Sequence, residues 1–121
     1  MKRSPAQPPR PTQTELDILR VLWQRGPSSV RDVQESLNDS RPTGYTTVLK
    51  MLQIMTVKGL AARDDRGRTH VYRAALPQEQ TQRQIVTDLL ERVFEGSASQ
   101  LIQQALASSA HRARKWRRSG A

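Results

Sequence analysis

Apolar residues recur at helical spacing near the start of the chain. The first run is Leu16, Leu19, Leu22 and Trp23. Just before it, Thr12 and Glu15 have the spacing of a capping box, in which each side chain bonds the backbone N–H of the other residue. The pattern predicts an amphipathic helix from Thr12 to about Gln24, with Trp23 as a packing residue. Gly26-Pro27 is expected to end it.

Two further helices follow from the same spacing. Ser28 or Ser29 can cap a short helix whose apolar face holds Val30, Val33 and Leu37. The next helix is expected from about Gly44 to Lys58, and Gly59 suits the left-handed residue after its end. Its apolar face holds Tyr45, Val48, Leu52 and Met55, and its polar face holds Thr46, Thr47, Lys50 and Gln53.

The period then changes from helical spacing to alternation. Residues 60–64 and 69–74 alternate as strands do, and Asp65-Arg66-Gly67-Arg68 separates them. Gly67 can take the positive φ that a tight turn requires. We therefore expect a β-hairpin rich in arginine.

Two helices are expected in the last third of the chain. Pro77 fits the first turn of the fourth helix, and a fifth is expected from about Ala98 to Ser108. Their apolar stripes hold Ile85, Val86, Leu89, Leu90, Val93, Phe94, Leu101, Ile102, Ala105 and Leu106. These stripes can pack on the chain's own first domain or on a partner helix. So many large apolar residues beyond a domain with its own small core favour a partner helix, and hence a dimerisation region.

Charge is concentrated at the two ends of the chain. The sequence has 20 Lys and Arg against 11 Asp and Glu, a net charge of +9. Residues 1–10 contribute three of these cations and residues 111–121 contribute five, with no acid in either segment. Residues 11–110 therefore hold 12 basic and 11 acidic residues, a net charge of +1. A strongly basic chain suggests nucleic acid, but here the body is almost neutral.

Composition excludes several classes of protein. With no cysteine, and with His70 and His111 separated by forty residues, neither a disulfide framework nor a metal centre is expected. His70 is expected to pack beside Tyr72. No phosphate-binding glycine loop or catalytic motif is present, so we expect neither an enzyme nor a bound cofactor. No apolar run is long enough to span a membrane, which predicts a cytoplasmic protein without membrane insertion.

The order of elements is that of a winged helix-turn-helix. The predicted fold is mainly α with a small β-hairpin wing, and the winged helix-turn-helix precedes a C-terminal helical dimerisation region. The expected parts are a disordered basic arm (1–11), the winged-helix domain (12–76), the dimerisation region (77–109) and a basic tail (110–121). Such a fold places the polar face of its third helix in the major groove of DNA.

Several residues are suited to contact DNA. Thr46 and Thr47 can meet a thymine methyl group or a phosphate oxygen, and Lys50 a guanine edge or a phosphate. Arg66 and Arg68 of the hairpin can bind phosphates. Tyr45, at the start of the third helix, can either pack under the wing or touch DNA.

Longer stretches resemble a known family. These are TQTELDILRVLWQRGPSSVRDVQESL, GYTTVLKMLQIMTVKGL and AARDDRGRTHVYRA. Together they resemble the penicillinase and methicillin-resistance repressors, the BlaI/MecI family, from residue 12 to about residue 108. The resemblance implies a dimeric transcriptional repressor that binds a two-fold-symmetric DNA operator. It also implies DNA contacts at Thr46, Thr47, Leu49, Lys50, Arg66 and Arg68.

The chain departs from that family in three ways. Members commonly end in a third C-terminal helix rich in acidic and leucine residues, where this chain has HRARKWRRSGA. In some members a nearby-encoded membrane sensor-protease leads to cleavage at an Asn-Phe bond, and the matching pair here is Gln104-Ala105. The cysteines of copper-sensing branches are missing.

Two alternatives stay open. A winged-helix adaptor that binds other proteins, and that binds nucleic acid only non-specifically through its basic ends, also fits the near-neutral body. The basic tail is either a solvated run of charge or a sequence-independent binder of phosphates.

Overall fold

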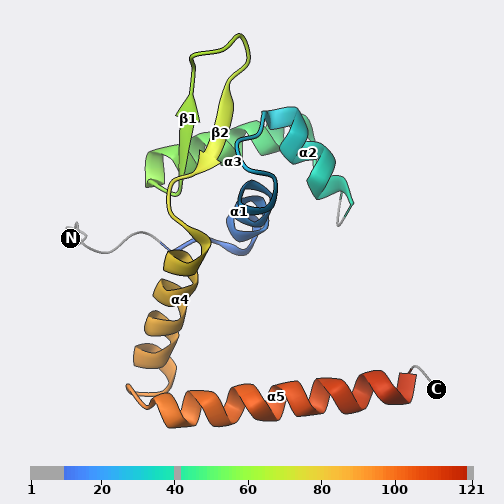
Figure 1. The fold of residues 1–121 in the computed structure, drawn as a ribbon, viewed down its shortest axis with the longest axis vertical. Coiled ribbons are helices and arrows are strands. Elements are labelled where there is room, and N and C mark those ends of the chain that lie inside the picture. Colours follow the sequence, from blue (N-terminus) through green and yellow to red (C-terminus); the bar gives the residue numbers. More distant parts are fainter. Residues whose placement is uncertain (1–9, 40–41, 120–121) are drawn as a thin grey trace. The chain divides into compact units, whose positions relative to one another are not determined.

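The computed structural model describes residues 10–39 and 42–119, with side chains described as far as Arg112. Residues 1–9 of the expected basic arm, and the last two residues of the expected tail, lie outside this description. The chain divides into two units, residues 1–82 and 83–121. The elements of both are labelled in Figure 1.

The first helix, α1 (Gln13–Arg25), begins and ends as its sequence signals predict. The Thr12 hydroxyl oxygen accepts a bond from the backbone N–H of Glu15 (3.2 Å), and the Thr12 N–H donates to Glu15 Oε1 (2.8 Å). Gly26 ends the helix with a φ of 84°. The expected capping box is therefore confirmed.

Ser29, rather than Ser28, caps α2 (Val30–Asn38). The Ser29 hydroxyl oxygen accepts from the backbone N–H of Asp32 at 3.1 Å. Ser28 is instead buried, and its backbone forms two 2.8 Å hydrogen bonds with the backbone of Tyr72. This isolated bridge joins the turn between α1 and α2 to a strand far along the chain.

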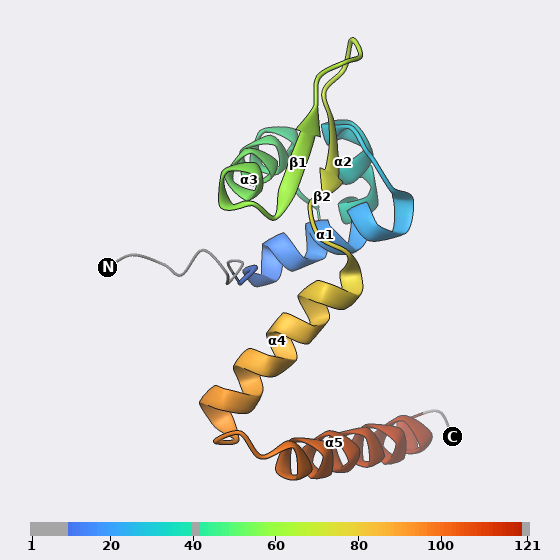
Figure 2. The ribbon, with the colours of Figure 1, turned by 60° about the vertical axis from the view of Figure 1, so that its left-hand side comes forward.

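The third helix and the hairpin follow directly. α3 (Tyr45–Lys58) ends at Gly59, whose φ of 86° lies in the left-handed region. The strands β1 (Ala61–Asp64) and β2 (Val71–Ala74) pair antiparallel, with Ala61 opposite Ala74. Figure 2 shows the hairpin extending past α2 and α3. Each strand is shorter than expected, so His70 lies in the loop. It is exposed there, and the expectation that it packs beside Tyr72 from within a strand was wrong.

One apolar core holds these elements together. Its buried members are Ile18, Leu19, Val21, Leu22, Val30, Val33, Leu37, Val48, Leu52, Met55, Leu60, Ala61 and Tyr72. Trp23 packs against this cluster, and its indole N–H donates to the carbonyl oxygen of Leu76 at 3.0 Å. The predicted packing role of Trp23 is confirmed. Burial of these side chains supplies the main driving force for folding.

A buried ion pair joins the beginning of α1 to the end of α3. The Glu15 side chain is 2% exposed, and its two carboxylate oxygens lie 2.8 and 3.0 Å from Lys58 Nζ. Burial alone would raise the pKa of Glu15. Hydrogen bonds from Lys58 and from the Thr12 N–H outweigh burial, so the pKa of Glu15 lies below its ordinary value.

The second unit contains most of α4 (Gln78–Val93) and all of α5 (Ala98–Ser119). Pro77 precedes α4, and its carbonyl oxygen accepts from the N–H of Thr81 at 3.2 Å. Gly96, with a φ of 83°, lies in the turn between the helices.

The expected end of α5 at Ser108 was wrong. The helix continues to Ser119 through residues that were assigned to a basic tail. Ala, Arg and Lys favour helix, and neither Gly nor Pro occurs between Ser97 and Ser119.

Loss of the buried ion pair should destabilise the first unit. We expect Lys58→Met to lower the free energy of unfolding by about 2–4 kcal/mol, because the carboxylate of Glu15 stays buried without its partner. The exposed pair of Arg25 and Asp32, 3.5 Å apart, supplies a matched control. Arg25→Ala should cost at most about 1 kcal/mol. Urea unfolding measures both, and equal losses would contradict the structural role of the buried pair.

The same pair should make stability depend on pH. A carboxylate whose pKa is lowered by folding stabilises the protein above its unfolded pKa, 4.5 for Glu15, and this contribution is lost as pH falls through the folded pKa. The stability advantage of the wild type over Glu15→Gln should therefore shrink as pH falls below 4.5. Urea unfolding over a pH series measures it, and a constant difference would disprove the linkage.

Candidate nucleic-acid interface

The outer face of α3 carries the polar residues that the sequence singled out. Thr46, Thr47 and Lys50 are all exposed near the beginning of the helix. Leu49 is only partly exposed, because it packs against the core cluster. The helix thus brings two short hydroxyls and one long cation together on its surface, while Leu49 lies at the edge of that face.

The wing carries several cations, and three of its basic side chains contact a carboxylate of Asp64 or Asp65. Arg66 Nη2 lies 2.9 Å from Asp64 Oδ2, and the backbone N–H of Arg66 also donates to Asp64. These hydrogen bonds from Arg66 lower the pKa of Asp64 to about 2. Arg63 Nε and His70 Nδ1 both contact Asp65 Oδ1, at 2.8 and 2.7 Å. Asp64 and Asp65 therefore offset part of the positive charge of the wing.

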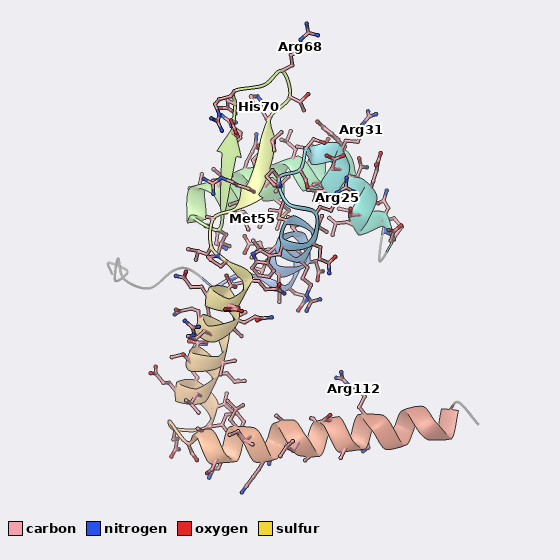
Figure 3. All side chains as sticks on the ribbon, viewed as in Figure 1. Arg25, Arg31, Met55, Arg68, His70 and Arg112 are labelled. Carbon is pink, nitrogen blue, oxygen red and sulfur yellow. The ribbon has the colours of Figure 1, made fainter. Side chains whose placement is uncertain are left out.

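Arg68 differs from Arg63, Arg66 and His70. Figure 3 shows its side chain at the tip of the hairpin, directed away from the rest of the unit. No ion pair is found for Arg68 within residues 10–39 and 42–112, whose side chains the structure describes. It is the wing cation best placed to meet an external anion.

A groove lies where α2, α3 and the wing meet. Its volume is about 580 Å³, and it is lined by Ser29, Val30, Arg31, Tyr45, Leu49, Arg68, Thr69, His70 and Tyr72. Tyr45, whose two possible roles were left open, lies in its wall and is 48% exposed. The groove combines cations with hydroxyl and imidazole donors, which suits phosphate oxygens.

Sequence reasoning missed Arg31 and His70 as members of this groove. Arg31 is exposed in the first turn of α2, and Figure 3 shows it on the outer side of that helix. Its place two residues after the Ser29 cap was a usable signal, because helix N-termini favour anions. The position of His70 was not predictable, since it depends on where the strands end.

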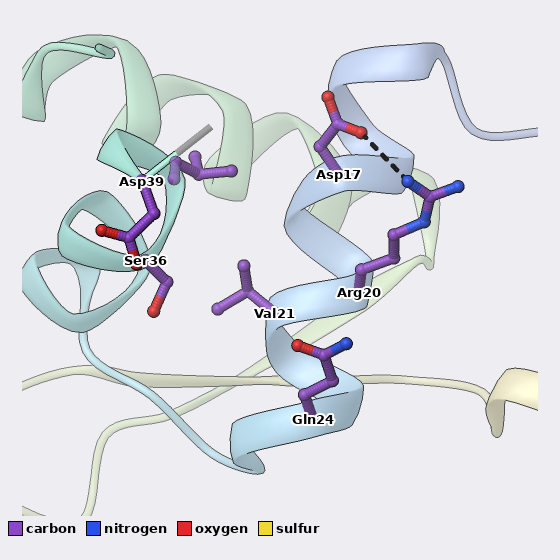
Figure 4. Close-up of a pocket in the computed structure, with 7 residues that line it drawn as sticks. Asp17, Arg20, Val21, Gln24, Ser36 and Asp39 are labelled. Atoms are coloured by element: carbon purple, nitrogen blue, oxygen red, sulfur yellow. Dashed lines mark ion pairs between the residues drawn. The ribbon is translucent and has the colours of Figure 1, made fainter. Parts of the chain in front are cut away.

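A second hollow lies between α1 and α2, as Figure 4 shows. Its volume is about 560 Å³, and it is lined by Asp17, Arg20, Val21, Gln24, Ser36, Leu37 and Asp39. Arg20 lies 3.8 Å from Asp17. Two carboxylates make this hollow a poor site for phosphate, and none of the predicted DNA-contact residues lines it.

The predicted dimerisation residues lie in the second unit. Those with the most exposed side chains are Val86, Leu89, Val93, Ile102 and Leu106, between 40% and 66% exposed. Ile85, Leu90, Phe94 and Leu101 are half-buried, and Ala105 is exposed. The apolar stripes of α4 and α5 are therefore largely uncovered in the single chain.

The described residues contain no cluster of three potential metal ligands. None of the helices in the described part of the chain is long and apolar enough to cross a membrane.

Comparison with known structures addresses the fold. The chain is similar to the monomeric form of BlaI from Bacillus licheniformis, whose solution structure was determined in complex with the blaP half-operator. That match has a TM-score of 0.53 and 22% sequence identity, over 60% of this chain and 89% of that chain. It confirms the predicted fold class, mainly α with a winged helix.

A second solved structure matches a smaller part of the chain. A structure of HOP2, reported for its DNA recognition and protein interaction domains, matches with a TM-score of 0.43 and 31% identity. It covers 47% of this chain and 91% of that chain. The comparison with curated proteins gave no match.

The family comparison covers most of the chain. The model of the penicillinase repressor family matches residues 11–116, which include α1–α4, the hairpin and most of α5. The resemblance seen in the sequence is thereby confirmed. The chain belongs to the penicillinase repressor family, whose members are transcriptional regulators and not enzymes.

Proposed function

We propose that the chain is a dimeric, sequence-specific DNA-binding repressor of transcription that acts in the cytoplasm on a pseudo-palindromic operator. One observation carries the proposal: the exposed polar face of α3 lies beside a cationic groove at the wing, in a fold of the penicillinase repressor family. The similar BlaI structure, solved with a half-operator, supports DNA as the partner.

The polar face of α3 supplies sequence recognition in this proposal. The major groove is about 12 Å wide and admits one α-helix. Thr46 and Thr47 are short enough to approach the floor of that groove, where their methyl groups can meet a thymine methyl. Lys50, one turn later, can reach a guanine edge or a phosphate. Leu49 contributes chiefly by packing, because it contacts the core.

The wing and the first turn of α2 supply contacts to the DNA backbone. Arg68 is available at the hairpin tip, and Arg31 lines the same groove from α2. Arg66 is already paired with the carboxylate of Asp64, which offsets its charge and occupies the donors on its Nε and Nη2. We therefore assign Arg68 the larger contribution to phosphate binding and Arg66 the smaller.

The second unit supplies dimerisation. Its uncovered apolar side chains, among them Leu89 and Ile102, are suited to pack against a second copy of the chain. A two-fold dimer presents one winged helix to each half-site. The half-sites should then lie about one helical turn apart, or slightly more.

A membrane sensor-protease is a further proposed partner. The bond that matches the family's cleavage position, Gln104-Ala105, lies within α5, and both residues are exposed. Cleavage there requires the helix to open locally, because proteolysis acts on opened segments. A membrane metallopeptidase gene beside the gene for this chain would support this partner, and a neighbourhood without one would count against it.

Substitutions at the two kinds of contact should have different effects. Lys50→Ala should weaken binding to the operator by about 1–3 kcal/mol and reduce discrimination against other sequences. Arg68→Ala should weaken binding to all duplexes alike and reduce the slope of log K against log salt by about 0.9 for each protomer. Electrophoretic shift with the promoter region of the chain's own gene, and with random duplex of equal length, measures both.

Arg20→Ala is the matched control for these variants. It also removes an exposed arginine, but from the hollow lined by Asp17 and Asp39, and it should leave DNA binding unchanged. Circular dichroism should show all three variants folded. A footprint that neither Lys50→Ala nor Arg68→Ala alters would disprove the site. A shift that is equally sensitive to salt on promoter and random duplex would favour the adaptor alternative.

A charge placed in the apolar stripe should break the dimer. We expect Leu89→Asp to shift the equilibrium from dimer to monomer, because the carboxylate cannot be buried unpaired between two copies. Thr87→Asp adds the same charge at an exposed polar position of α4 and should leave the dimer intact. Sedimentation equilibrium measures both, and a Leu89→Asp protein that is still dimeric would assign dimerisation to another surface.

A further inference from the structure

The charges of α5 are segregated along the helix. α5 is a 22-residue helix without an acidic residue, since the last Asp or Glu of the chain is Glu95. All five of its Lys and Arg residues fall within residues 112–118: Arg112, Arg114, Lys115, Arg117 and Arg118. The apolar side chains of Leu101, Ile102 and Leu106 belong to its first half. The helix thus has an apolar half and a cationic half.

The cationic half is not explained by helix stability. Cations at the end of a helix interact favourably with its dipole, but that effect is confined to about the last turn. Arg112 lies about two turns before Ser119. Like charges three or four positions apart, such as Arg114 and Arg118, repel each other on a helix. Because α5 holds no acid, no carboxylate within the helix offsets that repulsion.

The second unit also offers few counter-charges outside α5. Its acids are Asp88 and Glu91 of α4 and Glu95 of the following turn. Asp88 already lies 3.5 Å from Arg92. Arg112, the last residue whose side chain is described, is exposed. A row of cations with no acid on its own helix is suited to an external polyanion.

The composition of the cationic half favours phosphates over a lipid surface. Helices that lie in a membrane interface bury several large apolar residues on one face. Residues 107–119 contain one large apolar residue, Trp116, and otherwise small, polar or cationic residues. DNA instead presents a dense row of phosphates, which bind clustered Lys and Arg without regard to sequence.

We propose that residues 112–118 of α5 form a second DNA-binding site, which contacts backbone phosphates independently of base sequence. The inference rests on the proposed repressor function for its partner and adds a contact outside the winged helix. The winged helix selects the operator, and the cationic half of α5 strengthens binding to any duplex. In a dimer, two such segments act together.

Neutral replacements test this site while keeping the helix. In the Gln variant, Arg112, Arg114, Lys115, Arg117 and Arg118 are all changed to Gln, which also favours helix. In the Lys variant, the four arginines are changed to Lys, so that every charge stays. The slope of log K against log salt is measured on random duplex. It should be less steep in the Gln variant by up to about 4.5 for each protomer and unchanged in the Lys variant.

The outcomes separate this site from the proposed function. Both variants should retain the wild-type footprint on the promoter, at lower affinity for the Gln variant. An unchanged salt slope in the Gln variant, with circular dichroism and dimerisation intact, overturns the second site and leaves the repressor function standing. If neither the wild type nor the variants give a footprint on the promoter, but the salt slope on random duplex is still less steep in the Gln variant, the repressor function fails and the phosphate site stands.

Phosphatidylglycerol vesicles test the alternative that the cationic half of α5 binds an anionic lipid surface. Sedimentation with these vesicles should be weak and similar for the wild type and the Gln variant. Strong vesicle binding that the Gln variant loses, together with an unchanged slope on DNA, would overturn the DNA site in favour of a lipid surface.

Discussion

The ion pair between Glu15 and Lys58 is the constraint on which the candidate interface depends. One carboxylate closes the capping box of α1 through Thr12 and also holds the last turn of α3, 43 positions along the chain. Because that carboxylate is buried, it must keep its partners or lose stability. The pair therefore fixes the end of α3, while Val48, Leu52 and Met55 fix its inner face in the core. The exposed face that carries Thr46 and Lys50 is oriented as a consequence.

The wing is anchored to the core at its base by backbone hydrogen bonds, and it carries a cation, Arg68, at its tip. The backbone bridge between Ser28 and Tyr72 joins β2 to the turn before α2, so the hairpin is anchored where it leaves the core. Beyond that anchor, Asp64 and Asp65 take up much of the positive charge of the loop. Arg68 keeps its charge at the tip. Because of this division, Arg68 is the cation that the hairpin offers at its tip.

The net charge of the chain is a poor guide to where it recognises a partner. Residues 11–110 are almost neutral, and the α3 face contributes one cation, Lys50. The proposed recognition by the first unit therefore depends on the shape and arrangement of a few polar side chains. The cations of α5 lie in the other unit, where the proposed site contacts phosphates independently of base sequence. The two proposals thus assign specificity and non-specific attraction to different parts of one chain.

Local signals in the sequence determined most of the secondary structure, because caps, apolar periodicity and glycine positions act over a few residues. They predicted α1, α2 and α3 almost to the residue, and the hairpin with strands longer than those observed. They also predicted the core and the polar face of α3. The continuation of α5 to Ser119 was missed, although its signal is also local, since neither Gly nor Pro occurs between Ser97 and Ser119. Only the tertiary structure decided the partner of Glu15, the bridge from Ser28 to Tyr72, the partial burial of Leu49 and the groove that joins Arg31 to the wing. Each of these joins segments far apart in sequence, and such contacts follow from how elements pack rather than from the spacing within any one of them.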